Sequence, residues 1–224
     1  MKNIHKYINK LGFMCINIQK YHIYEKIGGL MKMREEALEI LFKYLETDRM
    51  RKHCYAVEAV MKDLAKRLEP EKEEEWAVAG LLHDLDSDIV GRKPGEICEG
   101  HATTTVELLK KENFGDEEMY RAILGHHDGM GVTRTSLMEK AIYAADPITG
   151  FITAIALVYP DKKLTSVKTK SVIKRMKETR FASNVNRDAM RSIEDIGIPF
   201  DEFAELSLNA MKNISDVLES NENE

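Results

Sequence analysis

The stretch EKEEEWAVAGLLHDLDSD, residues 71–88, contains the pattern that decides the fold. Its acidic residues come first, where their charge favours the N-terminus of a helix, and an uninterrupted apolar run follows them. An apolar run that is hydrophobic on all sides predicts a helix buried in the protein core, ending near Asp86. The adjacent pair His83-Asp84 is then expected on the last turn of that helix, inside the protein.

The rest of the chain has the same helical character. Apolar residues recur at three- and four-residue spacing, and no convincing period-two strand pattern occurs. We therefore predict an all-α fold. Pro147 and Gly197-Ile198-Pro199 are expected to end the helices that precede them. The spacing predicts helices at about 33–47, 48–69, 71–86, 101–111, 116–128, 135–146, 166–179, 184–195 and 201–218.

A length of 224 residues is enough for one well-buried domain. We expect this domain to span residues 31–218, with C-terminal helices at about 165–218 and a polar tail at 219–224. Residues 1–30 are interpreted as an N-terminal extension. Ile27-Gly28-Gly29 can be encoded by a bacterial ribosome-binding sequence just upstream of methionine codons, which favours a gene-start misassignment. A genuine, loosely attached N-terminal helix is the alternative.

Composition excludes several classes of protein. The net charge of −5 argues against a nucleic-acid polymer as partner, and no apolar run approaches the roughly 20 residues of a membrane-spanning helix. The three cysteines form no metal-knuckle pattern and give an odd count, which is typical of a reducing compartment. We expect a cytoplasmic protein without a membrane partner. The sequence leaves the oligomeric state open.

Histidine and aspartate supply the strongest functional pattern. Five of the seven histidines occur between positions 52 and 128, each on or at the end of an expected helix. His83-Asp84, His53 on a core-facing stripe and Asp146 at an expected helix end offer two imidazoles and two carboxylates. Such a mixed nitrogen and oxygen donor set suits Mn²⁺, Fe²⁺, Co²⁺, Ni²⁺, Mg²⁺ or Zn²⁺. The sequence therefore predicts a divalent metal site.

This arrangement resembles the HD-domain superfamily of metal-dependent phosphohydrolases, whose pattern is H…HD…D, over about residues 48–150. The segments HATTTVELL (101–109), AILGHH (122–127) and SLMEKAIYAAD (136–146) are similar to the dinuclear branch, which includes dinucleoside tetraphosphate hydrolases. The chain departs from the HD-GYP phosphodiesterases, because no GYP follows His126-His127 and Asp86 stands two residues after Asp84. The resemblance implies an all-α HD-domain bundle with additional C-terminal helices.

The resemblance also implies a role for each matching residue. The ligands of a first metal would be His53, His83, Asp84 and Asp146. His101 with His126 or His127 would bind a second metal, and Asp84 would bridge the two ions. We favour His126 over its neighbour, and the choice between them stays open. Asp84 and Asp146 are the predicted catalytic residues, since the first would orient the attacking water and the second would complete a metal shell or act as a base.

The expected reaction is hydrolysis of a phosphoester or phosphoanhydride by metal-activated water, on a small phosphorylated substrate that could be a nucleotide. The segment from Lys162 to Arg191 contains ten basic and two acidic residues. Part of this basic segment could face the phosphate, although a solvated surface is the simpler explanation. Candidate phosphate contacts are Lys93, Arg134, Lys174, Arg175 and Arg187. Two alternatives stay open: an HD-type di-iron oxygenase, and a non-catalytic regulatory or ligand-binding HD domain.

Overall fold

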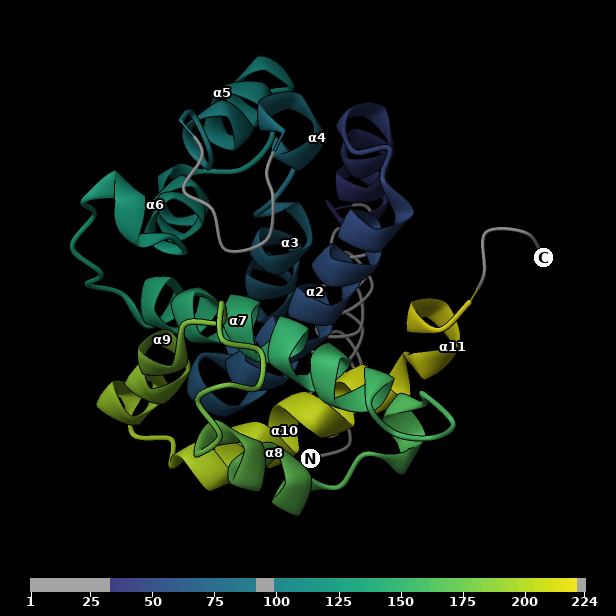
Figure 1. Ribbon diagram of the computed structural model, residues 1–224. Coiled ribbons are helices and arrows are strands. Elements are labelled where there is room, and N and C mark those ends of the chain that lie inside the picture. The colour runs from purple at the N-terminus through teal and green to yellow at the C-terminus, as the bar shows by residue number, and fades with distance from the viewer. Residues whose placement is uncertain (1–32, 92–98, 221–224) are drawn as a thin grey trace, which may run out of the picture.

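The structure is a computed structural model that describes residues 33–91 and 99–220 (Figure 1). These residues form α-helices and short 3-10 helices, and no strand occurs among them. The predicted all-α fold is confirmed. The expected N-terminal extension and Lys93 lie outside the described residues. After a helical segment at 33–44, the α-helices are α2 (Asp48–Leu68), α3 (Glu73–Leu82), α4 (Ser87–Val90), α5 (Thr103–Lys111), α6 (Glu117–Gly125), α7 (Leu137–Leu157), α8 (Thr169–Met176), α9 (Arg187–Arg191), α10 (Phe200–Asn213) and α11 (Ser215–Leu218).

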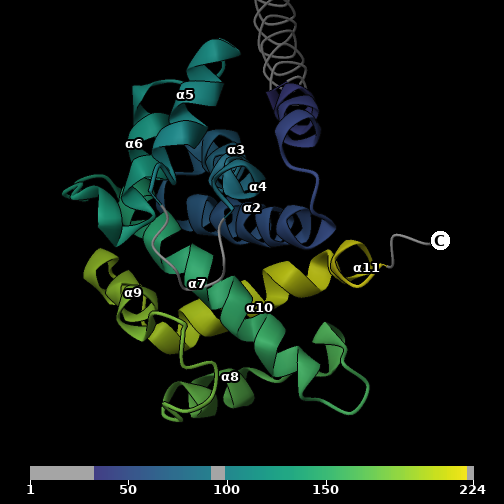
Figure 2. The same cartoon turned by 45° about the horizontal axis from the view of Figure 1, so that its top comes forward.

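Helices α2, α3 and α7 form the centre of the fold, and α2 packs against both of the others. Figures 1 and 2 show α4, α5 and α6 gathered at one end of this centre and α8 at the other, with α7 running between them. Helix α10 packs across α2 and α7 and closes the core. No helix in the described part of the chain is long and apolar enough to cross a membrane.

Burial explains why α3 occupies the centre. Every residue from Trp76 to Leu82 is buried, as the apolar run predicted. The helix ends at Leu82, earlier than expected, and His83 to Asp86 form turns directly after it. Because α3 is buried on all sides, this turn segment also lies in the interior, where His83, Asp84 and Asp86 are fully buried.

The expectation that Pro147 ends a helix is wrong. Helix α7 continues through Pro147 to Leu157. A proline inside a helix removes one backbone hydrogen bond and crowds the preceding turn. The residues that follow are strongly apolar, and Ile148, Phe151, Ile152 and Ile155 are fully buried. We infer that their burial outweighs the cost of the proline, because each large apolar side chain contributes roughly 1.5–3 kcal/mol when buried.

Other expected helices are shorter than predicted. Helix α8 covers only the middle of the expected segment 166–179, and the expected helix 184–195 is a short α-helix followed by a 3-10 helix, Ser192–Ile196. The last expected helix breaks at Ile214, between α10 and α11. His101 precedes α5 instead of starting it, and His126 and His127 follow the end of α6. Three of the candidate ligands thus lie in turns beside helix ends.

Side-chain hydrogen bonds cap the start of α7. Ser136 Oγ accepts a hydrogen bond from the Glu139 N–H at 3.2 Å, and the Glu139 carboxylate accepts one from the Thr135 N–H at 2.6 Å. Arg121 of α6 donates to the same carboxylate at 3.0 Å. Burial would raise the pKa of Glu139, but the hydrogen bonds from Thr135 and Arg121 outweigh it and lower that pKa. Glu139 therefore links α6 to α7 in its ionised form.

Acid should weaken this link. Because the folded-state pKa of Glu139 lies below its unfolded value of about 4.3, its stabilisation is present above that value and is lost as pH falls through the folded pKa. We expect Glu139→Gln to lower the free energy of unfolding by about 1–2 kcal/mol at pH 7. The difference between variant and wild type should shrink below about pH 4, measured by urea unfolding at several pH values. A pH-independent difference would contradict this account.

Close packing of α3 on α2 gives a second prediction. A Cβ added at Gly80 would lie 3.0 Å from the backbone of Val57, whereas one added at Gly150 of α7 would have nothing within 4 Å. We expect Gly80→Ala to destabilise the protein by about 1–3 kcal/mol through overpacking. The matched control Gly150→Ala should be neutral or stabilising by up to about 1 kcal/mol. Thermal unfolding in EDTA measures both, and equal effects would contradict the packing argument.

Candidate metal centre

Two long helices supply the outer side of the candidate site. His53 lies within α2 and Asp146 within α7. Nε2 of His53 is 3.0 Å from Oδ1 of Asp146, and Nε2 of His83 is 3.9 Å from the same oxygen. These three residues form one of the groups in the described chain that could hold a metal ion. The helical stripe that placed His53 toward the core thus brings it to Asp146.

A single carboxylate lies at the centre of the candidate site. Oδ2 of Asp84 is 3.6 Å from Nε2 of His53 and 3.5 Å from Nε2 of His83. The other oxygen, Oδ1, is 3.4 Å from Nε2 of His101 and 3.5 Å from Nε2 of His126. The two oxygens of one carboxylate therefore face two different pairs of imidazoles. This is the arrangement that a bridging ligand between two cations requires.

The turn before α5 presents His101 to this carboxylate. Gly100 has a φ of 83° and Ala102 a φ of 64°, so His101 lies between two left-handed residues. Such a conformation costs about 1–3 kcal/mol for a residue with a side chain, and it is typical of positions where function constrains the backbone. It aims the ring of His101 at His126, with the two Nε2 atoms 3.1 Å apart.

Hydrogen bonds at the far side of each ring fix which nitrogen faces the site. All four imidazoles have an oxygen acceptor at Nδ1: Thr149 Oγ1 at 3.2 Å for His53, Gly80 O at 2.8 Å for His83, Asp86 Oδ1 at 2.9 Å for His101 and Ile123 O at 2.5 Å for His126. In the neutral form of each ring, an acceptor at Nδ1 keeps the ring proton there and leaves the lone pair on Nε2. All four lone pairs then point inward.

Thr149 needs a separate argument because a hydroxyl can donate or accept. Its Oγ1 donates to the backbone carbonyl of Asp146 at 2.9 Å. Having given up its only proton there, it accepts from Nδ1 of His53. Thr149 therefore orients a ligand that lies on a different helix.

The donor set fits cations better than it fits an apolar core. Nε2 of His83 is buried without a hydrogen-bond partner, and the Nε2 atoms of His101 and His126 lie 3.1 Å apart, with two lone pairs facing each other when both rings carry their proton on Nδ1. The separations of 3.0 Å from His53 Nε2 to Asp146 Oδ1 and 3.4 Å from His101 Nε2 to Asp84 Oδ1 match the edges of a coordination polyhedron, about 3.0–3.4 Å long for bonds of about 2.1 Å. The remaining separations between Nε2 atoms and carboxylate oxygens, up to 3.9 Å, are longer than such an edge. His83, Asp84 and His126 also form a metal-compatible group.

Exposure is unequal across the site. The side chains of His53 and Asp146 are 20% and 17% exposed, whereas those of Asp84 and His101 are 0% and 1% exposed. A ligand from solvent therefore reaches the His53–Asp146 side first. The half formed by His101 and His126 is enclosed.

His127 takes a different role from His126. Its Nδ1 accepts a hydrogen bond from the Gly129 N–H at 3.1 Å and caps the 3-10 helix Asp128–Met130. Its ring centroid is 5.3 Å from that of His101, but Nε2 of His126 is the nitrogen that faces Asp84. The geometry favours His126 as the ligand.

Arg134 belongs to a polar frame beside the candidate site. It donates to the Gly125 carbonyl at 2.5 Å and to Asp128 at 2.9 Å, and its guanidinium lies 3.3 Å from the ring centroid of Tyr143. Asp128 also accepts from the Tyr143 hydroxyl at 2.8 Å and from Asn186 at 3.3 Å. Burial and the bond to Asp128 raise the pKa of Tyr143. This frame joins the end of α6 to α7 and to the start of α9.

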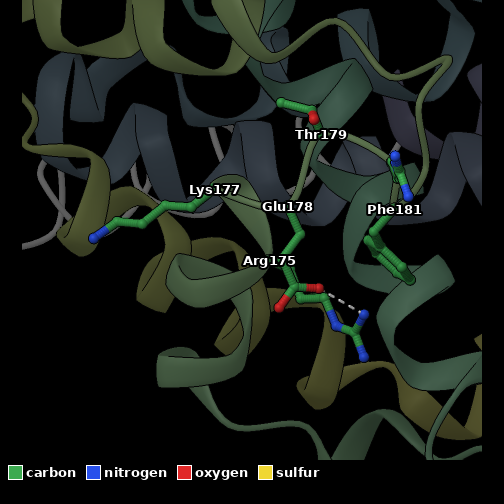
Figure 3. Close-up of a pocket in the computed structure, with 6 residues that line it drawn as sticks. Arg175, Lys177, Glu178, Thr179 and Phe181 are labelled. Carbon is green, nitrogen blue, oxygen red and sulfur yellow. Dashed lines mark hydrogen bonds and ion pairs between the residues drawn. The ribbon is translucent and has the colours of Figure 1, made fainter.

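The hydrogen bonds and ion pairs of Arg175 and Arg187 go to groups outside the candidate ligands. Arg175 pairs with Glu178 at 2.9 Å, and Arg187 donates to the backbone carbonyls of Glu178, Phe181 and Ala182. Lys174 is exposed on α8. A hollow of about 530 Å³ lies at the end of α8, and none of the candidate ligands lines it (Figure 3). Its lining residues are Arg175, Lys177, Glu178, Thr179, Arg180 and Phe181.

Sequence reasoning missed Asp86 and Thr149 as residues that orient ligands. Asp86 is fully buried and contacts His101, and Thr149 contacts His53. The position of Asp86 within HDLD was one available signal, since a charge inside an apolar turn calls for a partner. The sequence around Thr149 carries no such signal, because its contact with His53 arises only where α2 and α7 cross.

Comparison with known proteins agrees with this geometry. Residues 50–149 match the HD domain family, over the segment that carries all seven candidate ligands. Residues 50–149 therefore form an HD domain, a class of metal-binding domain whose members are commonly hydrolases and in some cases non-catalytic. No match was found among curated proteins or solved structures.

The two adjacent histidines can be separated by experiment. We expect His126→Ala to weaken or abolish binding of one Mn²⁺ ion, because it removes an inward-facing Nε2, and His127→Ala to bind Mn²⁺ like the wild type. Saturating Mn²⁺ at 100 times its dissociation constant should stabilise wild type and His127→Ala by about 2.7 kcal/mol per site. Thermal unfolding with Mn²⁺ and with EDTA measures this. Equal losses in both variants would show that His127 is also a ligand.

Proposed function

We propose that this protein is a metal-dependent phosphohydrolase of the dinuclear type, which cleaves a phosphoester or phosphoanhydride bond in a small phosphorylated metabolite. The observation that carries the proposal is the position of Asp84, whose two oxygens face separate pairs of imidazoles. The HD domain family and the inward-pointing lone pairs support it. The first cation would be held by His53, His83, Asp84 and Asp146, and the second by Asp84, His101 and His126.

Two divalent cations held in this way would lower the pKa of a water molecule and neutralise phosphoryl charge. The side chains supply the remaining requirements. Asp84 would hold the two metal sites at a fixed separation, because its carboxylate is fully buried and cannot turn toward solvent. Its burial in the enclosed half also limits access of bulk water, which strengthens electrostatic interactions with a substrate.

Asp146 is the proposed proton acceptor. It combines a contact to His53 with partial exposure, so that it can reach a water molecule on the open side of the site. The bond from Thr149 to its backbone carbonyl holds this turn of α7 in place. A carboxylate in this position can bind the first cation or take the proton of the attacking water.

The substrate is proposed to be small and to carry its phosphate at an accessible end. Tyr143, whose ring lies under the Arg134 guanidinium, precedes Asp146 of the open side by three residues in α7. A nucleotide would satisfy these requirements, with the aromatic and guanidinium groups beside its base or sugar. A nucleic-acid polymer is disfavoured by the net charge of −5.

A screen of phosphorylated metabolites against Mn²⁺, Fe²⁺, Co²⁺, Ni²⁺, Mg²⁺ and Zn²⁺, with phosphate release as the readout, tests the proposal. Elemental analysis of the purified protein accompanies it. Release of phosphate from at least one substrate with a bound divalent metal is expected. Oxygen consumption without phosphate release would instead support the di-iron oxygenase, and an empty site in unchelated protein would support a non-catalytic domain.

Substitution of the shared carboxylate is the sharpest genetic test. We expect Asp84→Ala to abolish metal binding and to lower phosphate release by at least about 1,000-fold, because Asp84 is the one ligand that both proposed metal sites share. The matched control is Asp88→Asn, which alters an exposed carboxylate bound to Thr47 at 2.6 Å. Asp88→Asn should retain both metal binding and phosphate release. Wild-type hydrolysis by Asp84→Ala would refute the assignment.

A further inference from the structure

Asp86 is a buried carboxylate that the proposed hydrolysis does not use. It is fully buried, two residues after the shared carboxylate. Its Oδ1 is 2.9 Å from Nδ1 of His101, and its Oδ2 accepts a hydrogen bond from the Thr105 N–H at 3.3 Å. Both oxygens therefore act as acceptors. Burial of an ionised carboxylate costs free energy unless hydrogen bonds replace its hydration. The contacts with His101 and Thr105 therefore indicate that Asp86 has a specific role at this position.

His101 differs from the other three imidazoles in the partner at its Nδ1. The partners of the others are neutral: a carbonyl for His83, a carbonyl for His126 and a hydroxyl for His53. A carboxylate is a stronger acceptor and adds negative charge behind the ring. Carboxylate–histidine pairs of this kind fix the tautomer and orientation of metal-binding histidines.

Asp86 also fixes the position of His101 through the backbone. Its own N–H donates to Thr105 Oγ1 at 3.1 Å, in return for the bond from the Thr105 N–H. Thr105 lies in the first turn of α5, whose N-cap residue Ala102 provides no side-chain hydrogen bond. The reciprocal pair thus ties the turn after α3, which carries Asp84, to the helix start beside His101.

We propose that Asp86 is a positioning residue that sets the affinity of the enclosed cation group, formed by Asp84, His101 and His126. This inference rests on the proposed dinuclear function. Thr149 has the corresponding role for the partly exposed metal site, which contains His53, His83, Asp84 and Asp146. Its neutral hydroxyl contacts Nδ1 of His53. The two halves of the site are therefore adjustable independently, each through one residue that contacts no cation.

Titration of the full-length, EDTA-treated protein with Mn²⁺ tests the proposal, with bound and free Mn²⁺ counted by electron paramagnetic resonance. We expect the wild type to bind two ions. In Asp86→Asn, one ion should bind 10–100-fold more weakly and the other unchanged. An amide has one acceptor and one donor at these positions, so it cannot accept from His101 and Thr105 together. If the amide NH₂ of the Asp86→Asn variant faces His101, Nδ1 of the ring must accept, and the ring proton moves to Nε2.

Two matched variants separate positioning from simple support of the fold. Thr105→Val removes the hydroxyl that accepts from the Asp86 N–H but keeps the Thr105 N–H and leaves the carboxylate on His101, so it should weaken binding of the same ion much less than Asp86→Asn does. Thr149→Val should weaken the ion that Asp86→Asn leaves unchanged. Loss of the same ion to the same extent in Thr105→Val and Asp86→Asn would overturn the proposal, as would unchanged binding in Asp86→Asn.

One measurement needs no variant. Nitrogen-15 spectra of the imidazoles in the metal-free wild type should show the ring proton of His101 on Nδ1. A proton on Nε2 would overturn the proposal whether or not Asp86→Asn folds.

Failure of the proposed function would give a different result. A wild type that binds two ions but hydrolyses no phosphorylated metabolite would remove the hydrolase assignment and leave the role of Asp86 intact. Hydrolysis by the wild type, combined with unchanged metal binding in Asp86→Asn, would remove only the role of Asp86.

Discussion

The interaction on which the structure depends is the contact of one buried carboxylate, that of Asp84, with four imidazole nitrogens. Transfer of an ionised carboxylate from water to a protein interior costs several kcal/mol unless opposite charge or hydrogen bonds compensate. Neutral imidazoles with lone pairs on Nε2 add no positive charge of their own. Bound cations would supply the compensation. The neighbouring helices therefore need enough apolar packing to hold these groups together before a metal binds.

That packing explains where the ligands lie. The fully apolar run of α3 carries its C-terminal turn, with His83, into the interior, and helix ends beside it supply His101 and His126. The two partly exposed ligands instead lie within the long helices α2 and α7. Turn residues can converge on one point from several directions, while the long helices present a rigid outer edge to the substrate.

Sequence periodicity was sufficient for the all-α fold and for a core-facing His53, because both follow from local helical geometry. It was insufficient for the continuation of α7 through Pro147, since the apolar packing that offsets the proline is a tertiary effect. The meeting of His101 and His126 with Asp84 could be expected from the family resemblance alone. Asp86 and Thr149 act through contacts that depend on the left-handed turn at Ala102 and on the crossing of α2 and α7.

A count of charge favours two cations over one. Asp84, Asp86 and Asp146 together contribute three negative charges to the site and its immediate support. One divalent cation would leave this region with net negative charge, which repels a phosphate, whereas two would leave it positive. The candidate basic side chains already have oxygen partners outside the ligand set: Arg134 pairs with Asp128, Arg175 with Glu178, and Arg187 with backbone carbonyls. In the proposed reaction, attraction of a phosphorylated substrate would then come from the cations themselves, which gives a physical reason for the enclosed group to hold a metal throughout the catalytic cycle.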